Sequence, residues 1–153
     1  MQQSLGSAPV SDEPSNAASK GLHAAYAIFA IGRPTEELVR ASLTDDFAYE
    51  DRRRVFRFPD ADVGSYPVFV GSVWQTGAGG QPRFEVETLA VRGERFAVIG
   101  IEIDYGNGML AESVHVFGLD ATLSLLQRDV DFDLDDVDGA IAELDRLHSE
   151  ANA

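Results

Sequence analysis

The clearest chemical signal in the sequence is a glutamate and a histidine on the two strands of one expected hairpin. Residues 95–105 alternate and are rich in β-branched residues, residues 109–119 form the returning strand, and the Asn-Gly pair at 107–108 between them suits a type I′ turn. Pairing through that turn sets residue 102 opposite residue 113, so that Glu102 and His115 share a face. A carboxylate that orients an imidazole and raises its pKa is an arrangement for general acid–base catalysis.

The same face has a second interpretation. It carries Asp104, whereas the opposite face carries Ile99, Ile101 and Ile103 and is more uniformly apolar. Glu102 and His115 would therefore be catalytic, and Asp104 a ligand contact, if their face lines a pocket. All three would merely be solvated if their face points outward or toward a partner.

A second set of candidates lies on an expected strand over residues 47–53. Alternation places Tyr49, Asp51 and Arg53 on one face of it. Asp51 is a further candidate for acid–base catalysis, and Tyr49 and Arg53 are candidates for ligand binding, because a guanidinium binds oxyanions in a planar fork. The alternative is that Asp51 and Arg53 form a structural ion pair within a basic run.

Two aromatic residues on expected helices complete the candidate set. Tyr26 and Trp74 lie on apolar stripes, at which an aromatic side chain either fills the core or contacts a ligand. Each carries a polar tip that needs a partner when it is buried.

No metal or cofactor is expected. The chain has no cysteine, and its three histidines are far apart in sequence. The aspartates between 129 and 138 lack the glycine and the glutamate of a calcium-binding loop, so we interpret them as helix caps and a solvated acidic rim. Glycine-rich phosphate loops and nucleophile elbows are also missing from the sequence.

The order of expected elements predicts an α+β fold. Two helices are expected first, at residues 17–31 after a cap at Ser15 or Asn16, and at residues 35–43 with Thr35 as the cap. A strand at 47–53, a third helix that starts at about residue 65 and includes Trp74, and a run of antiparallel strands over 84–132 follow. A last helix, capped by Asp133 or Asp135, reaches about residue 147. Such an order favours a cone-shaped, curved antiparallel sheet with the helices packed on one face around an apolar pocket. Residues 1–16 are predicted to be a disordered tail, residues 77–80 a glycine-rich loop, and residues 17–150 one domain.

Composition limits the partners. With 26 acidic and 12 basic residues, the net charge of −14 makes nucleic acid or an anionic membrane an unlikely partner. No apolar stretch approaches the roughly 20 residues that span a bilayer, and the N-terminus does not resemble a secretory signal. We therefore expect a cytoplasmic protein.

The element order and three local stretches resemble the nuclear transport factor 2-like superfamily. Residues 45–54, 92–97 and 132–145 are similar to SnoaL-like domains of the type found at the ends of multidomain bacterial regulators, and the whole resemblance covers about residues 18–150. The resemblance implies a cone with one small-molecule pocket and a homodimer formed through the sheet.

The resemblance leaves the activity open, because members include isomerases, cyclases, dehydratases and epoxide hydrolases as well as non-catalytic domains. No member's catalytic set can be placed on the sequence residue by residue. The first expectation is a domain that binds a small apolar or mixed organic ligand in an accessory or regulatory role. The alternatives are a cofactor-independent isomerase, cyclase or hydrolase that uses a carboxylate and a histidine, and a module that only dimerises. Convergent ionisable groups inside the pocket would favour an enzyme.

Overall fold

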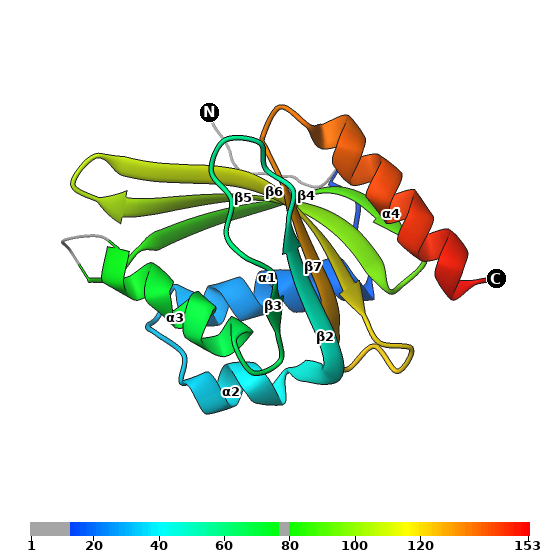
Figure 1. The fold of residues 1–153 in the computed structure, drawn as a ribbon, viewed down its shortest axis with the longest axis horizontal. Coiled ribbons are helices and arrows are strands. Elements are labelled where there is room, and N and C mark those ends of the chain that lie inside the picture. The colour runs from blue at the N-terminus through cyan, green and yellow to red at the C-terminus, as the bar shows by residue number, and fades with distance from the viewer. Residues whose placement is uncertain (1–12, 77–79) are drawn as a thin grey trace, which may run out of the picture.

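The computed structural model describes residues 13–76 and 80–153 (Figure 1). The elements in chain order are α1 (Ala17–Phe29), α2 (Glu36–Ala41), β2 (Leu43–Asp51), β3 (Ala61–Asp62), α3 (Tyr66–Thr76), β4 (Arg83–Arg92), β5 (Phe96–Gly106), β6 (Met109–Leu119), β7 (Leu126–Phe132) and α4 (Val137–Ala151). This order confirms the predicted α+β class. The short strand β3 was not predicted.

The strands form one curved sheet in the order β3-β2-β7-β6-β5-β4 (Figure 1). Strands β4 to β7 are antiparallel neighbours, as predicted for a meander. One pairing differs from the expected antiparallel sheet, because β2 runs parallel to β7 and makes the sheet mixed. This pairing brings residues near position 50 beside residues near position 130.

The β5–β6 hairpin turns at the predicted Asn107-Gly108 pair, and both residues have positive φ, 46° and 84°. A bulge between Asp104 and Gly106 then shifts the register by one residue. As a result Ile99 pairs with His115, and Glu102 pairs with Glu112. The predicted pairing of Glu102 with Ser113 was wrong, and Glu102 and His115 lie on opposite faces of the sheet.

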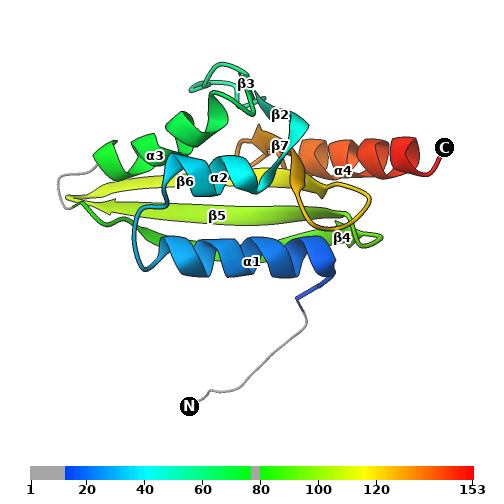
Figure 2. The same cartoon turned by 90° about the horizontal axis from the view of Figure 1, so that it is seen from below.

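We call the face that carries Ile99 and His115 the inner face and the one that carries Val98 and Glu102 the outer face. Helix α1 packs on the inner face, against a cluster that includes Ile99. Helix α4 packs on the outer face, against Val98 and its neighbours, through Leu144. The two helices thus cover opposite faces of the sheet (Figure 2), whereas all helices were predicted on one face.

Side-chain caps set where three helices begin. Asn16 caps α1 and Thr35 caps α2, as predicted, and each accepts a hydrogen bond from the helix's first turn. Asp136 caps α4, in place of the expected Asp133 or Asp135. Asn16 also donates to the carbonyls of Gly93 and Phe96, which fixes the start of α1 to the β4–β5 turn.

Two predictions lie wholly or partly outside the described residues. Of the predicted tail, residues 1–12 are not described, while residues 13–16 contact the sheet through Asn16 and through Glu13, which accepts a hydrogen bond from the Thr88 backbone. Residues 77–79 of the glycine-rich loop are also not described. Across the described ranges, no helix is both long and apolar enough to cross a bilayer.

Candidate active site

A cavity of about 440 Å³ lies between the inner face of the sheet, α3 and the segment after β2. Most of its lining is aliphatic or aromatic, including Ile101, Ile103 and Phe69. Strands β6 and β7 contribute one polar cluster to it, which consists of Ser113, His115, Asp129 and Asp131. The cavity is therefore a largely apolar space with a cluster of ionisable groups, as small-molecule sites commonly are.

The centre of this cluster is the imidazole of His115, which lies between two carboxylates. Its Nδ1 is 3.0 Å from Oδ1 of Asp129 and 2.6 Å from Oδ1 of Asp131. Only the contact with Asp129 has hydrogen-bond geometry, and Oδ1 of Asp131 has no hydrogen-bond partner. Both aspartates are almost fully buried, with 2% and 3% of their surfaces exposed.

Two tyrosines bind the outer oxygens of these carboxylates. The hydroxyl of Tyr66, at the start of α3, donates to Oδ2 of Asp129 over 2.6 Å. The hydroxyl of Tyr49, on β2, donates to Oδ2 of Asp131 over 2.9 Å. Each carboxylate is thus held from one side by a tyrosine, while its other oxygen points toward His115. Burial and the negative charges nearby raise the pKa of both tyrosines, which keeps them protonated as donors.

The environment drives the pKa values of the two aspartates apart. Burial and the charge of Asp129 raise the pKa of Asp131 well above its ordinary value, despite the opposing effect of His115. Burial also raises the pKa of Asp129, but the charge of His115 and hydrogen bonds outweigh it and leave a net lowering. Two buried carboxyl groups in contact cannot both ionise readily, so Asp131 holds a proton and Asp129 is the carboxylate.

His115 is the positive member of the cluster. Burial lowers its pKa, but the negative charge that Asp131 and Asp129 share as a pair, together with their hydrogen bonds, outweighs burial and raises it to about 10. The imidazole ring also stacks on Phe117, with ring centroids 5.3 Å apart. At neutral pH the cluster therefore contains an imidazolium, a carboxylate and a neutral carboxyl group.

Ser113 completes a chain of contacts that resembles a serine hydrolase triad. Its Oγ lies 2.8 Å from Nε2 of His115, whose Nδ1 contacts Asp129. A nucleophilic serine needs a neutral imidazole to take its proton, however, and His115 is protonated at neutral pH. Ser113 therefore accepts a hydrogen bond from the imidazolium, and its own hydroxyl proton remains available to the cavity.

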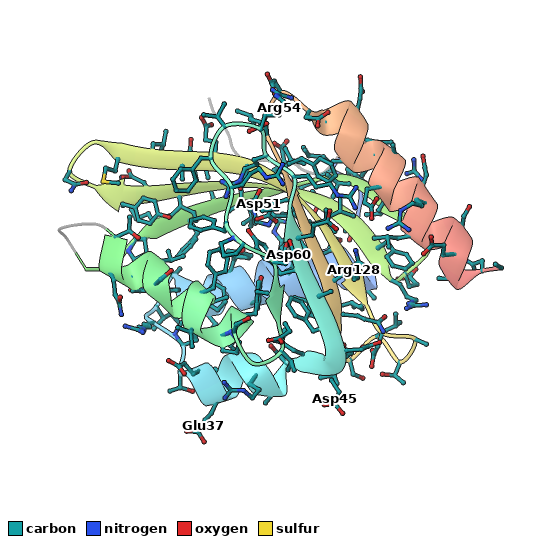
Figure 3. All side chains as sticks on the ribbon, viewed as in Figure 1. Glu37, Asp45, Asp51, Arg54, Asp60 and Arg128 are labelled. Carbon is teal, nitrogen blue, oxygen red and sulfur yellow. The ribbon has the colours of Figure 1, made fainter. Side chains whose placement is uncertain are left out.

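The predicted pairing of Asp51 with Arg53 is present. The guanidinium of Arg53 contacts both oxygens of Asp51, at 2.9 and 2.7 Å, and the backbone amides of Arg53 and Phe58 also donate to this carboxylate. Arg53 lines the cavity and lies over the rings of Phe56 and Phe58. Asp51 lies near the centre of the molecule in Figure 3, far from peripheral acids such as Glu37.

Tyr26 is the other predicted ligand contact that lines the cavity. Its ring packs against Phe29 and Phe84, and its hydroxyl makes no hydrogen bond with any residue that the structure describes. Burial, followed by the charges of Asp129 and Asp131, raises the pKa of Tyr26 well above its ordinary value. The phenol is therefore a neutral donor near the two carboxylates.

Tyr49 and Asp51 do not line the cavity themselves, but they contact Asp131 and Arg53, which do. Three further predicted site residues lie away from this cavity. Trp74 packs against Phe29 and Phe84, and its indole donates to Gln81. Asp104 forms an ion pair with Arg83 near the hairpin turn. The third, Glu102, is on the outer face.

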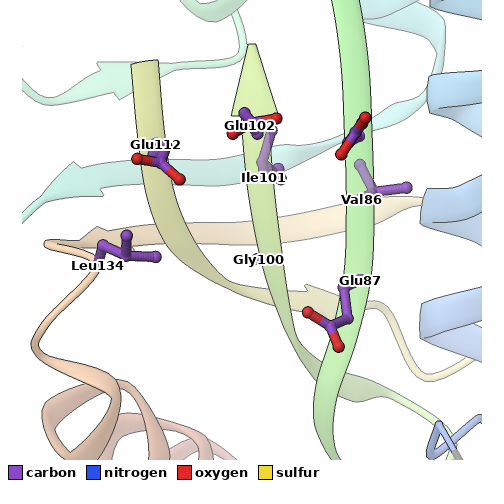
Figure 4. Close-up of a pocket in the computed structure, with 8 residues that line it drawn as sticks. Val86, Glu87, Gly100, Ile101, Glu102, Glu112 and Leu134 are labelled. Atoms are coloured by element: carbon purple, nitrogen blue, oxygen red, sulfur yellow. The ribbon is translucent and has the colours of Figure 1, made fainter. Parts of the chain in front are cut away.

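A shallow pocket surrounds Glu102 on the outer face. Figure 4 shows the carboxylates of Glu102, Glu112 and Glu87 extending from neighbouring strands onto this surface. Partial desolvation and the charges of Glu85 and Glu112 raise the pKa of Glu102. The predicted acid–base pair of Glu102 with His115 is thus not formed, because the bulge turns the two side chains to opposite faces.

Asp129 and Asp131 were not predicted as site residues, because the aspartates between 129 and 138 were interpreted as helix caps and a solvated acidic rim. A signal was available in their spacing. The two aspartates alternate with Val130 and Phe132 on an expected strand, so they share one face of it. The parallel pairing with β2 then sets Tyr49 beside Asp129 and Asp51 beside Asp131, and both carboxylates of β7 are buried.

The three central residues could also be considered as metal ligands. His115, Asp129 and Asp131 offer one donor atom each within 4.8 Å of one another. However, Nδ1 of His115 and Oδ1 of Asp131 are 2.6 Å apart, closer than the roughly 3 Å between adjacent ligands of an ion with bonds of about 2.1 Å. The spacing fits a shared proton better than a shared cation.

Comparisons with known proteins give matches of structure only. No protein-family model and no curated protein sequence matches the chain. An NTF2-like protein of unknown function from Mesorhizobium loti matches with a TM-score of 0.56 and 11% identity, over 78% of this chain and 94% of that chain. The chain has the nuclear transport factor 2-like fold.

Two enzymes share this NTF2-like fold. The BvnE pinacolase from Penicillium brevicompactum matches with a TM-score of 0.57 and 14% identity, over 86% of this chain and 92% of that chain. An LEH-like epoxide hydrolase from M. tuberculosis matches with a TM-score of 0.51 and 16% identity, over 76% of this chain and 77% of that chain. At these identities the likeness is one of fold.

Proposed function

We propose that the protein is a cofactor-independent acid–base enzyme that acts on a small, mostly apolar organic molecule bound in the cavity. The observation that supports this most directly is the contact of one imidazole with two buried carboxyl groups in a largely apolar space. Placing such groups in a cavity costs folding free energy, so their convergence there favours a functional role over a structural one.

The opposite shifts in pKa divide the roles between the aspartates. Asp129, as the carboxylate, would remove a proton from a carbon next to a carbonyl group or from an attacking water. Asp131, as the neutral acid, would donate a proton or a hydrogen bond to the substrate oxygen. His115 touches both groups, and so it would stabilise the changes in their charge as the proton moves.

Two neighbouring groups would orient the substrate. The phenol of Tyr26 has no hydrogen-bond partner within residues 13–76 and 80–153 and is affected by the charges of Asp129 and Asp131, and Ser113 has a hydroxyl proton that the imidazolium does not use. Both can donate to a substrate oxygen. These groups suit an isomerisation, a cyclisation or an addition of water, which are the reaction types that the SnoaL-like resemblance implies. The pinacolase and the epoxide hydrolase are two enzymes with the same fold.

The second candidate is a ligand-binding domain without catalysis. The apolar lining of the cavity, with Phe56, Phe58 and Phe69 on one side, favours tight binding of an organic ligand whether or not it reacts. The ionisable cluster separates the two functions, since simple binding does not need an acid and a base in contact.

The experiment uses two substrate probes. Purified protein is assayed for the isomerisation of 3-cyclohexen-1-one, followed by ultraviolet absorbance, and for the hydrolysis of styrene oxide, followed by chromatography. We expect turnover of at least one probe, insensitive to EDTA, and a fall in kcat/KM of about 100-fold or more in Asp129→Asn and in Asp131→Asn. Glu102→Gln is the matched control, because it removes a carboxylate from the outer face.

The outcomes separate the candidates. Turnover that survives both aspartate substitutions would overturn the proposed roles. Binding of both probes without turnover, unchanged in Asp129→Asn, would favour the ligand-binding domain instead.

A further inference from the structure

We propose that the ligand is an elongated, uncharged molecule whose oxygen-bearing end lies at Asp129 and Asp131 and whose apolar tail occupies a second hollow between α1, α2 and α3. This inference rests on the proposed function, because it assumes that the reactive end of the ligand lies at the ionisable cluster.

The second hollow is distinct in chemistry from the first cavity. It has a volume of about 230 Å³ and lies between the three N-terminal helices and the inner face of the sheet. Its walls are almost wholly hydrocarbon, from residues such as Leu22, Ala25, Phe29, Val39 and Phe117. Such a lining offers nothing to a polar group and favours an alkyl or terpenoid chain.

The two spaces meet at three residues. Tyr26, Tyr66 and Val70 line both the cavity and the hollow. The hydroxyl of Tyr66 also donates to Asp129 over 2.6 Å, so Tyr66 lies at the boundary between the ionisable cluster of the cavity and the apolar hollow. A molecule held at Asp129 therefore needs only to extend past these side chains for its tail to reach the hollow.

The far end of the hollow opens to solvent between α1 and α2. Ile28 on α1 and Leu38 on α2 line this opening, and both are exposed, at 54% and 56% of their surfaces. A pair of large exposed aliphatic side chains at the mouth of an apolar space suits the entry, or the protruding end, of an apolar chain.

The charge balance at the cavity argues for an uncharged ligand. The guanidinium of Arg53 is already paired with Asp51 through two contacts within 3.0 Å, and His115 is paired with Asp129. With Asp131 neutral, no cation facing the cavity remains unpaired among the described residues. An anionic ligand would bring an unbalanced charge into a largely apolar space, which is unfavourable.

The test measures binding rather than turnover. Dissociation constants of 1-alkanols from butanol to octanol, and of the corresponding alkanoates, are measured by calorimetry and by fluorescence of Trp74, the chain's single tryptophan, which packs on Phe29 of the hollow. We expect affinity for the alkanols to rise about fourfold per added methylene. Each alkanoate is expected to bind more weakly than the alkanol of equal length.

Matched substitutions on α1 localise the effect. Ala25 lines the hollow, whereas its neighbour Ala24 is exposed and lines none of the described pockets. Ala25→Phe should abolish the gain from the longer alkanols and leave butanol binding unchanged, and Ala24→Phe should behave as the wild type. Leu38→Trp narrows the mouth from the exposed side of α2, so it supplies the same test if Ala25→Phe fails to fold.

The binding measurements test the tail site independently of the turnover measurements that test the proposed function. Equal affinities for butanol and octanol, or equal effects of Ala25→Phe and Ala24→Phe, would overturn the proposed tail site. Tighter binding of the alkanoates would overturn the uncharged ligand. Asp129→Asn should lose turnover but keep the dependence of binding on chain length, so failure of one proposal does not hide failure of the other.

Discussion

His115 on β6 and Asp131 on β7 are directly paired across the sheet, and their Nδ1 and Oδ1 atoms lie 2.6 Å apart. Asp129, two residues earlier on β7, takes the hydrogen bond from the same nitrogen. Since one N–H cannot align with two acceptors, Oδ1 of Asp131 lacks a donor. Burial and the charge of Asp129 raise the pKa of Asp131, and a proton retained by Asp131 is compatible with this missing donor.

We expect His115 to remain an imidazolium well above neutral pH. Its pKa is raised to about 10 because Asp131 and Asp129 outweigh the cost of burial. Heteronuclear NMR of the imidazole nitrogens should show both protonated at about pH 8. Asp129→Asn should lower this pKa by removing the ionised partner, and a neutral ring in the wild type at that pH would contradict the assignment.

The raised pKa of His115 also predicts how stability depends on pH. An unfolded histidine has a pKa of about 6.5, so between this value and about 10 the folded state binds more protons than the unfolded state. The stabilisation is complete below about pH 6.5 and is lost as the pH rises toward 10. We expect the free energy of unfolding, measured with urea, to fall from about pH 7 to about pH 9.5, and to fall less in His115→Gln. Equal slopes in the two proteins would count against this linkage.

The two aspartates should respond differently to the same substitution. Asparagine resembles a neutral carboxyl group, so Asp131→Asn should cost less than about 1 kcal/mol at neutral pH. Asp129→Asn leaves a buried imidazolium without its carboxylate and should cost about 3 kcal/mol or more. Urea unfolding of both variants measures the difference, and the reverse order would exchange the protonation states assigned to them.

Much of the fold could be predicted from local sequence patterns. The alternation in β5 and β6, the Asn-Gly turn, and the caps at Asn16 and Thr35 are all signals that act within a few residues. The parallel pairing of β2 with β7 joins segments about 80 residues apart, and no local period encodes it. The placement of α4 on the outer face likewise depends on the burial of both faces of the sheet.

The candidate site was predicted in part. Three of the candidates, His115, Tyr26 and Arg53, line the cavity. The carboxylate partners of His115 were missed for two reasons. The bulge after Asp104 was not predicted, although Gly106, which has a φ of 81°, was a local signal for it. Asp129 was hidden in a run of acidic residues that resembles a solvated rim.

The ion pair of Asp51 and Arg53 should be important for stability. The Asp51 side chain is fully buried and accepts from the guanidinium and from two backbone amides. Asp51→Ala leaves Arg53 and these amides unpaired, so we expect a loss of about 3–5 kcal/mol. The control is Asp60→Ala, at an exposed position in the loop that follows. Equal unfolding midpoints for the two variants in urea would show that the pair contributes little.

The outer face bears on the homodimer that the resemblance implies. A two-fold contact through this surface would bring together two copies of the glutamate cluster around Glu102 and Glu112. We expect light scattering to find a monomer at about pH 7.5 and more association at about pH 5, because the raised pKa of Glu102 lowers its negative charge as the pH falls. Glu102→Gln should favour association at the higher pH, and a dimer through this face that is stable at both values would contradict the expectation.

The extra residue in the bulge between Asp104 and Gly106 decides which side chains of the hairpin strand face the cavity and which face outward. Deleting a single residue there would restore the uninterrupted ladder and turn one arm over, exposing its isoleucines to water and setting glutamates against the imidazole. A length change at this tip, remote from the catalytic groups, would therefore be more damaging than most substitutions beside them.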